Sequence, residues 1–110
     1  MLQRTLASSV HVTGVGLHSG ERVSLTMHPA DVDTGIRFRR TDLEGEQGEI
    51  IPLSPMLIND TRLSSTIVTE SGVRVGTIEH IMSALSAMGI DNVLIELNAP
   101  EIPIMDGSSL

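Results

Sequence analysis

The stretch that decides the fold is residues 77–89, which read TIEHIMSALSAMG. Apolar side chains recur here at steps of three and four and predict an amphipathic helix with one buried face. They are Ile78, Ile81, Met82, Leu85 and Met88. Thr77 is a suitable N-cap, and Gly89 is a suitable stop because glycine adopts the left-handed conformation that ends many helices. Glu79 and His80 therefore lie in the first turn.

Glu79 and His80 are the candidate functional residues of this helix. The helix dipole favours a carboxylate in the first turn, and consecutive helix positions point about 100° apart, so both side chains can line one concave site. A metal hydrolase needs both groups, an imidazole as ligand and a carboxylate to move a proton. The alternative is ordinary helix-end electrostatics beside an exposed histidine, and these two residues alone leave both interpretations open.

The sequence on either side of the helix alternates in the manner of β-strands. Val23, Leu25 and Met27 alternate with polar residues, which predicts a half-buried strand. Further strands are expected at residues 5–12, 36–40 and 93–97, with residues 14–20 as a loop, residues 42–49 as an exposed connection and residues 52–55 as an irregular piece. Residues 66–70 and 73–75 predict a hairpin closed at Ser71-Gly72. Residues 59–66 fit either a turn with a strand start or a ligand-facing strand end. We expect an α+β two-layer sandwich, mostly antiparallel, with the helix on one face.

Composition limits the functions that the chain can have. Its 110 residues make one domain at most, and its formal net charge of −7 disfavours binding to nucleic acid, which depends on neutralising phosphates. All seven basic residues are arginines. Three of them cluster at Arg37, Arg39 and Arg40, which fits a solvated strand edge guarded by charge or a contact with an anionic ligand.

The absence of cysteine means that any metal must be held by histidines and carboxylates. No second histidine follows His80 at the spacing of a metal-binding helix, and His11 and His28 lie in strand patterns, where ordinary histidines are expected. His18 lies in the glycine-rich loop. A complete small metal hydrolase that uses His18 and His80 with Asp60 or Asp106 would require distant loops to converge on one metal.

Neither a signal peptide nor a membrane span is apparent, so we expect a cytoplasmic protein. The apolar Ile102–Met105 run followed by Asp106–Ser109 resembles the lead-in to another element. We therefore expect the chain to be part of a longer protein.

Several strings, taken in order, resemble the N-terminal half of the UDP-3-O-acyl-N-acetylglucosamine deacetylase family. They are GVGLHSG at 14–20, RTD at 40–42, DT at 60–61, TIEH at 77–80, GIDN at 89–92 and NAPEIPIMDGS at 98–108. The resemblance covers essentially the whole chain, and the last string is the most specific.

The resemblance implies a zinc-dependent cytoplasmic enzyme of Gram-negative bacteria that removes an acetyl group from a UDP-linked acylated glucosamine, the committed step of lipid A synthesis. It also implies two similar α+β domains around a buried site. His80 would be a zinc ligand, Glu79 the general base that takes a proton from the metal-bound water, and Leu63 and Ser64 substrate-binding residues. Relatives vary at the position of Ser64.

The same resemblance places the remaining zinc ligands, a second catalytic histidine and most of the acyl-chain passage in a C-terminal domain, which this chain lacks. Residues 1–110 would then be the N-terminal domain, on which the C-terminal domain packs. One histidine cannot complete a catalytic zinc site, so we expect the isolated chain to be inactive. The competing interpretation is a non-catalytic interaction or regulatory domain.

Overall fold

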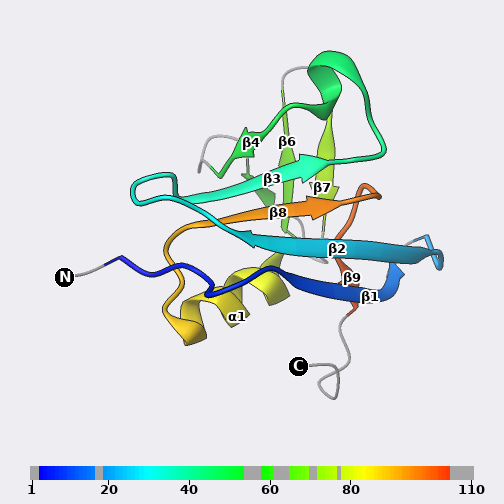
Figure 1. Cartoon of the computed structure of the whole chain (residues 1–110). Helices are drawn as coiled ribbons and strands as arrows, with labels where there is room; N and C mark the ends of the chain where they lie inside the picture. Colours follow the sequence, from blue (N-terminus) through cyan, green and yellow to red (C-terminus); the bar gives the residue numbers. More distant parts are fainter. Residues whose placement is uncertain are drawn as a thin grey trace.

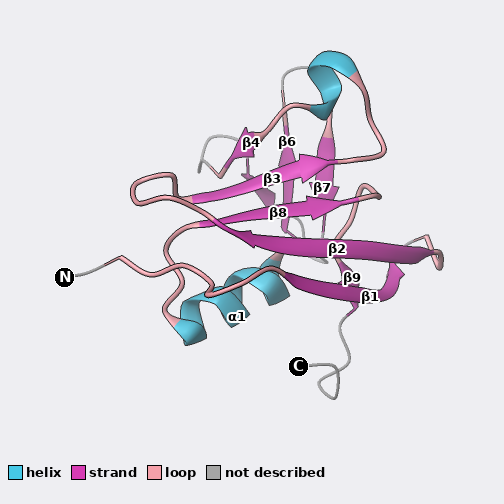
Figure 2. Ribbon diagram, in the orientation of Figure 1, coloured by secondary structure: helices cyan, strands magenta, loops and turns pink. Residues whose placement is uncertain are grey.

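The computed structural model describes residues 3–16, 19–53, 58–60, 65–69, 72–76 and 78–104. Strands predominate in this part of the chain, with a single α-helix and one short 3-10 helix (Figures 1 and 2). The helices are α1 (Glu79–Met88) and η1 (Gly45–Gly48). The strands are β1 (Val10–Gly16), β2 (Arg22–Pro29), β3 (Ile36–Arg40), β4 (Ile51–Pro52), β5 (Ile58–Asp60), β6 (Ser65–Val68), β7 (Arg74–Gly76), β8 (Val93–Leu97) and β9 (Pro103–Ile104).

Six strands form the main sheet, in the order β4-β3-β8-β2-β1-β9. The pair β3–β8 is parallel and every other neighbouring pair is antiparallel. After β3 and η1 the chain adds β4 beside β3, then forms the small sheet and α1, and returns at Val93 as β8, which pairs with β3 and β2. The prediction of a mostly antiparallel sheet is confirmed.

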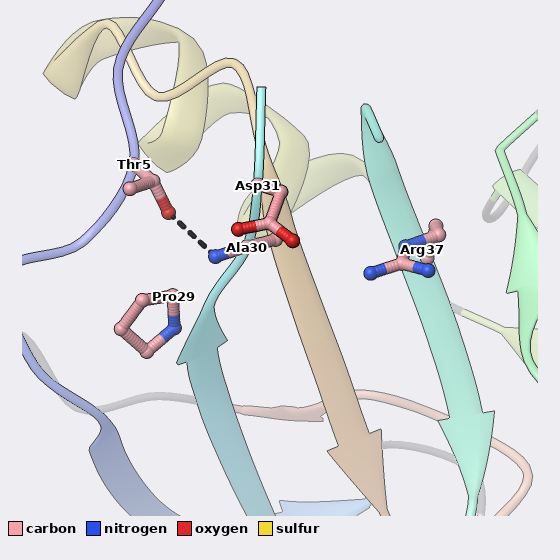
Figure 3. Close-up of a pocket in the computed structure, with 5 residues that line it drawn as sticks. All are labelled: Thr5, Pro29, Ala30, Asp31 and Arg37. Carbon is pink, nitrogen blue, oxygen red and sulfur yellow. Dashed lines mark hydrogen bonds between the residues drawn. The ribbon is translucent and has the colours of Figure 1, made fainter. Parts of the chain in front are cut away.

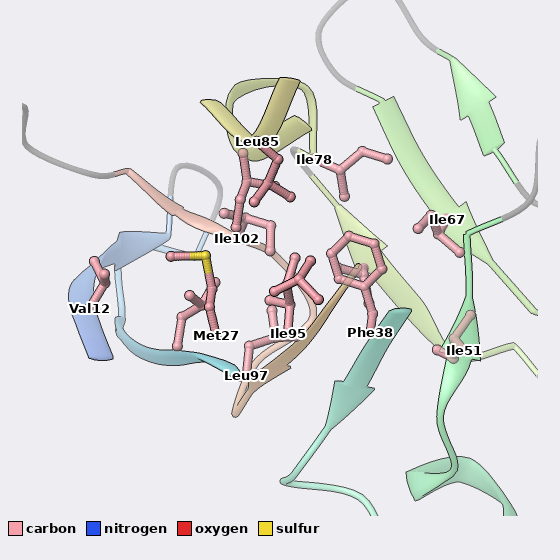
Figure 4. Close-up of a cluster of buried hydrophobic side chains, with 14 of the residues drawn as sticks. Val12, Met27, Phe38, Ile51, Ile67, Ile78, Leu85, Ile95, Leu97 and Ile102 are labelled. Atoms are coloured by element: carbon pink, nitrogen blue, oxygen red, sulfur yellow. The ribbon is translucent and has the colours of Figure 1, made fainter. Parts of the chain in front are cut away.

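Helix α1 covers one face of the main sheet. Its buried residues Ile81 and Leu85 belong to one apolar cluster with Leu25 and Ile95 from the sheet. Figure 4 shows Leu85 from the helix close to Ile95 and to Ile102, which precedes β9. The period-two pattern of β2 buries Val23, Leu25 and Met27, as predicted. The fold is therefore the expected α+β arrangement of two layers.

A second sheet, in the order β5-β6-β7, packs against the same core. Ile67 of β6 pairs with Val75 of β7, and both side chains are fully buried in the apolar cluster. The N–H of Thr69 donates to the carbonyl oxygen of Val73 at 3.0 Å and closes this end of the pair. The predicted hairpin is confirmed, although Ser71 lies outside the described residues.

The two ends of α1 differ in how well the sequence predicts them. Gly89 has a φ of 70° in the left-handed region, and the N–H of Ile90 donates to the carbonyl oxygen of Leu85 at 2.9 Å. The predicted stop is confirmed. The predicted N-cap is wrong, because Ile78 occupies that position without a side-chain cap, and Thr77 lies outside the described residues. Ile78 is 2% exposed, so burial rather than a capping hydroxyl fixes this end.

The first strand begins at Val10, five residues later than the predicted start at residue 5. Residues near Thr5 pair elsewhere: Thr5 forms an isolated bridge with Asn92, and the carbonyl oxygen of Arg4 accepts from the N–H groups of Asp91 and Asn92. Their main-chain groups are thereby satisfied outside the sheet, and β1 starts at Val10. Strand β1 also extends into the predicted loop, as far as Gly16.

The short elements were not predicted. The predicted exposed connection of residues 42–49 contains η1, and Pro52 belongs to β4 rather than to an irregular piece. Strands β5 and β9 span three and two residues, too few for a pattern of alternation. Within the described part of the chain, no helix is both long enough and apolar enough to span a membrane.

Candidate functional site

The start of α1 places Glu79 and His80 immediately after a buried anchor. Strand β7 ends at Gly76, and Ile78 inserts into the core, so that the first helical residue is Glu79. Glu79 is partly buried and His80 is exposed. The predicted location of the pair, in the first turn of a helix, is confirmed.

His80 lies on the helix face opposite the core. Ser83 and Ala87, three and seven positions further on, are exposed as well, and such spacing places side chains on one face. Ile81 and Leu85 hold the opposite face against the sheet. The imidazole therefore points away from the core of this domain, towards the exposed side of α1.

The main chain just before α1, at Gly76, is hydrogen-bonded to residues 100–102, near the C-terminal end of the sequence. The N–H of Gly76 donates to the carbonyl oxygen of Pro100 at 2.7 Å, and the N–H of Ile102 donates to the carbonyl oxygen of Gly76 at 2.9 Å. Gly76 and Glu101 form the corresponding parallel bridge. Residues 100–102 thus fix the main chain three residues before Glu79.

Glu101 is a buried residue of this neighbourhood that sequence reasoning missed. Its side chain is 5% exposed, and Oε1 accepts from the N–H of Ser19 at 3.1 Å and from Oγ of Ser19 at 3.2 Å. The signal available in the sequence was a charged residue between Pro100 and Ile102, where an apolar residue would be expected. The partner, 82 residues away, could not be identified from the pattern.

The strand histidines have partners on the sheet face away from α1. His11 Nδ1 lies 2.9 Å from Oγ1 of Thr26. His28 Nδ1 lies 3.0 Å from Oγ of Ser9, and His28 Nε2 lies 2.5 Å from Oε1 of Glu96. The prediction that both histidines lie in strands is confirmed.

Strand β4 pairs with β3 only at Arg37 and Phe38, so Arg37 is not at a sheet edge, whereas Arg39 and Arg40 lie beyond the end of β4. The edge interpretation is therefore wrong for Arg37, and the other two arginines have partners. Arg39 Nε donates to the carbonyl oxygen of Gly48 at 3.1 Å, and Arg40 forms an ion pair with Asp42. Arg37 differs from them: its Nε is buried and has no hydrogen-bond partner among the described residues.

Arg37 lines a pocket of about 320 Å³ at the end of β2. The other lining residues are Thr5, Pro29, Ala30 and Asp31, as Figure 3 shows. The N–H of Ala30 donates to Oγ1 of Thr5 at 2.9 Å and closes one side. Neither Glu79 nor His80 belongs to its lining, so this pocket and the candidate catalytic pair are separate.

The donor set for a metal is incomplete in the described part of the chain. No three residues among His, Asp and Glu converge there as a metal site, so His80 is a single candidate ligand. His18 and Asp106 lie outside the described residues, as do the predicted substrate-binding residues Leu63 and Ser64. The alternative of a self-contained site built on His18, His80 and Asp60 or Asp106 therefore stays a prediction.

An α+β domain that presents a glutamate and a histidine at a helix start is compatible with a hydrolase. The family model for UDP-3-O-acyl N-acetylglycosamine deacetylase matches residues 3–110, and the chain belongs to this family. It is 82% identical over all 110 residues to the UDP-3-O-acyl-N-acetylglucosamine deacetylase of Neisseria meningitidis serogroup B (strain MC58). The corresponding protein of Chromobacterium violaceum is 62% identical over 109 residues, 99% of the chain.

The match covers a minor part of those relatives. The chain spans 36% of the length of the Neisseria protein and 35% of the Chromobacterium protein. About two thirds of each relative therefore has no counterpart in these 110 residues.

Proposed function

We propose that this chain supplies the Glu79–His80 part of the active site of a zinc-dependent, cytoplasmic UDP-3-O-acyl-N-acetylglucosamine deacetylase of a Gram-negative bacterium. The substrate would be a UDP-linked acylated glucosamine, and the reaction would be hydrolysis of its N-acetyl group, the committed step of lipid A synthesis. The exposure of His80 on the free face of α1 carries the proposal, because a ligand shared with a second domain has to point out of the first. The 82% identity to a relative of that name supports it.

The donor chemistry at the start of α1 fits one part of a zinc site. A catalytic zinc has about three protein ligands, and an accessible neutral imidazole is among its commonest. His80 would be the ligand from this chain, and the other two would come from residues that the longer relatives possess in addition. When bound, zinc lowers the pKa of water towards neutrality and polarises a carbonyl group.

Glu79 would act as the general base for the attacking water and would pass the proton to the departing amine. Its position next to His80 holds the carboxylate beside the metal ligand, while the buried Ile78 and the bonds at Gly76 keep this turn in place. Leu63 and Ser64 would contact the substrate near the acetyl group. Residues on the free face of α1, including Ser83 and Ala87, would contact the C-terminal domain.

The test uses the full-length protein with UDP-3-O-acyl-N-acetylglucosamine as substrate, following acetate release together with zinc content. We expect His80→Ala to lose zinc and activity together. Glu79→Gln should retain zinc and lose activity by on the order of a hundredfold or more, because general-base catalysis contributes that much. Val32→Ala, at a side chain that is 65% exposed in the connection between β2 and β3, is the control and should keep both zinc and most of the activity.

A different set of results would reject the proposal. If the full-length protein binds no zinc and releases no acetate, the non-catalytic alternative of an interaction or regulatory domain is favoured. If Glu79→Gln has the activity of the wild type, the general-base role is wrong even when zinc is present.

A further inference from the structure

The pocket at the end of β2 is built by three segments that are remote in sequence. Thr5 comes from the extended N-terminal segment, Asp31 from the connection after β2 and Arg37 from β3. The main chain holds each of them. Thr5 forms its bridge with Asn92, and the carbonyl oxygen of Asp31 accepts from the N–H of Thr34 at 3.2 Å. At Arg37, β3 is paired on both sides. The fold therefore fixes this part of the lining before any ligand arrives.

Arg37 brings to this pocket a positive charge that lacks a partner among the described residues. Its Nε is buried without an acceptor, and its terminal nitrogens, which bond to no described residue either, remain open at the pocket. A guanidinium group stays charged at any physiological pH, and a buried donor without an acceptor costs free energy. Arg39 on the same strand differs, because the carbonyl oxygen of Gly48 accepts from it. An oxyanion in the pocket would supply Arg37 with a partner.

Asp31 contributes the opposite charge without neutralising Arg37. Its carboxylate lines the same pocket but forms no ion pair with Arg37 or with any other described residue. The two residues come from either side of β8, as Figure 3 shows, and strands two places apart in a sheet are separated by roughly 10 Å. Two opposite charges thus face one pocket and are too far apart to pair directly.

We propose that this pocket binds a small zwitterion, an amino acid whose carboxylate lies against Arg37 and whose ammonium group lies against Asp31. Asp31 repels a simple anion and Arg37 repels a simple cation, whereas a zwitterion is attracted at both of its ends. The hydroxyl group of Thr5 accepts from the N–H of Ala30 at 2.9 Å and keeps its own hydrogen for a ligand oxygen. The volume of about 320 Å³ limits the ligand to a small molecule.

The test is an NMR titration of the isotopically labelled full-length protein with glycine, β-alanine and γ-aminobutyrate, in which the two charges lie increasingly far apart. We expect one of the three to bind with a Kd of about 1 mM, a reasonable value for so few atoms. The matching acid without an ammonium group, which is acetate, propionate or butyrate, should bind about tenfold more weakly, as the loss of one charged hydrogen bond predicts. Absence of binding by all three amino acids would overturn the proposal. Equal binding of the matching acid would show a plain anion site and would overturn it as well.

Two variants test the two ends of the ligand separately. Arg37→Met should weaken binding of the amino acid at least about tenfold without lowering the melting temperature, because an apolar side chain replaces a buried donor that has no acceptor. Asp31→Asn, at an exposed position where folding is retained, should weaken binding of the amino acid about tenfold but not binding of the matching acid. Unchanged affinity in either variant would reject the assigned contacts.

Arg39→Gln is the matched control, since Arg39 lies two positions from Arg37 on the same strand and does not line the pocket. It should bind the amino acid as the wild type does, and a loss equal to that of Arg37→Met would reduce the effect to net charge and contradict the proposal. Neither Glu79 nor His80 lines this pocket, so the proposal is independent of the deacetylase function. Its readout is ligand binding rather than zinc content or acetate release, and the two proposals therefore fail separately.

Discussion

A β-carbon at Gly16 would lie 2.0 Å from Oε1 of Glu101, so the buried, hydrogen-bonded carboxylate would have to move to admit it. We therefore predict that Gly16→Ala lowers the free energy of unfolding by about 1–3 kcal/mol, the usual cost of overpacking. Denaturant unfolding measures this. Combination with Glu101→Ala should be less harmful than the sum of the single variants, because the shorter side chain removes the clash. Strictly additive values would show that the two residues do not meet.

Phe38 is fully buried at the centre of the core, between both sheets and α1 (Figure 4). Phe38→Ala should lower the free energy of unfolding by about 3–5 kcal/mol through loss of apolar contact and creation of a cavity. Val32→Ala, at a side chain that is 65% exposed, should change it by less than about 0.5 kcal/mol. Equal effects of the two substitutions in a thermal or denaturant unfolding experiment would contradict the assigned core.

Gly89 ends α1 with a φ of 70°, which side chains with a β-carbon rarely adopt. Its nearest neighbours, atoms of Arg4, lie at ordinary contact distance, so backbone strain rather than a clash determines the cost of a substitution. We expect Gly89→Ala to destabilise the domain by about 1 kcal/mol and Gly89→Asn by less. Ser86→Ala, on the exposed side of the helix, serves as the control. A Gly89→Ala variant as stable as the wild type would refute the left-handed cap.

The isolated 110-residue chain should bind zinc weakly, because His80 is its single candidate ligand among the described residues. Calorimetric titration of the wild type and of His80→Ala should therefore give indistinguishable isotherms, and the chain should release no acetate from the substrate. Tight binding of one zinc per chain that His80→Ala abolishes would mean that this chain completes its own ligand set. The self-contained hydrolase would then be the better description.

The parts of the fold that the sequence predicts are those whose burial is decided locally. Leu25 and its neighbours two positions away alternate because one face of β2 meets the core, and Ile81 and Leu85 are four apart because one face of α1 does. The parallel pairing of β3 with β8 leaves no such trace, since nothing within either strand identifies its partner. Thr5 shows the same limit: it belongs to an extended segment but pairs with Asn92 instead of a strand.

In the candidate site, too, the local features could be predicted and the long-range contacts could not. The positions of Glu79 and His80 in a first turn follow from the helical period, and the structure agrees. The role of Glu101 in holding Ser19 depends on a contact across 82 residues and could not be found from spacing. The residues that would complete the metal site could not be predicted, because the proposal assigns them to the part of the longer relatives that has no counterpart in these 110 residues.

The central position of β8 affects how the chain folds while it is being translated. Strands β2 and β3 are never neighbours, because β8 lies between them, and β8 is translated only after residues 41–92. At ordinary translation rates, β8 is synthesised roughly three to ten seconds after β3, and until then the apolar side chains of Val23 and Leu25 remain in contact with water. During this interval the nascent chain exposes an apolar, aggregation-prone surface, and we expect its yield in cells to depend on chaperones that bind nascent chains.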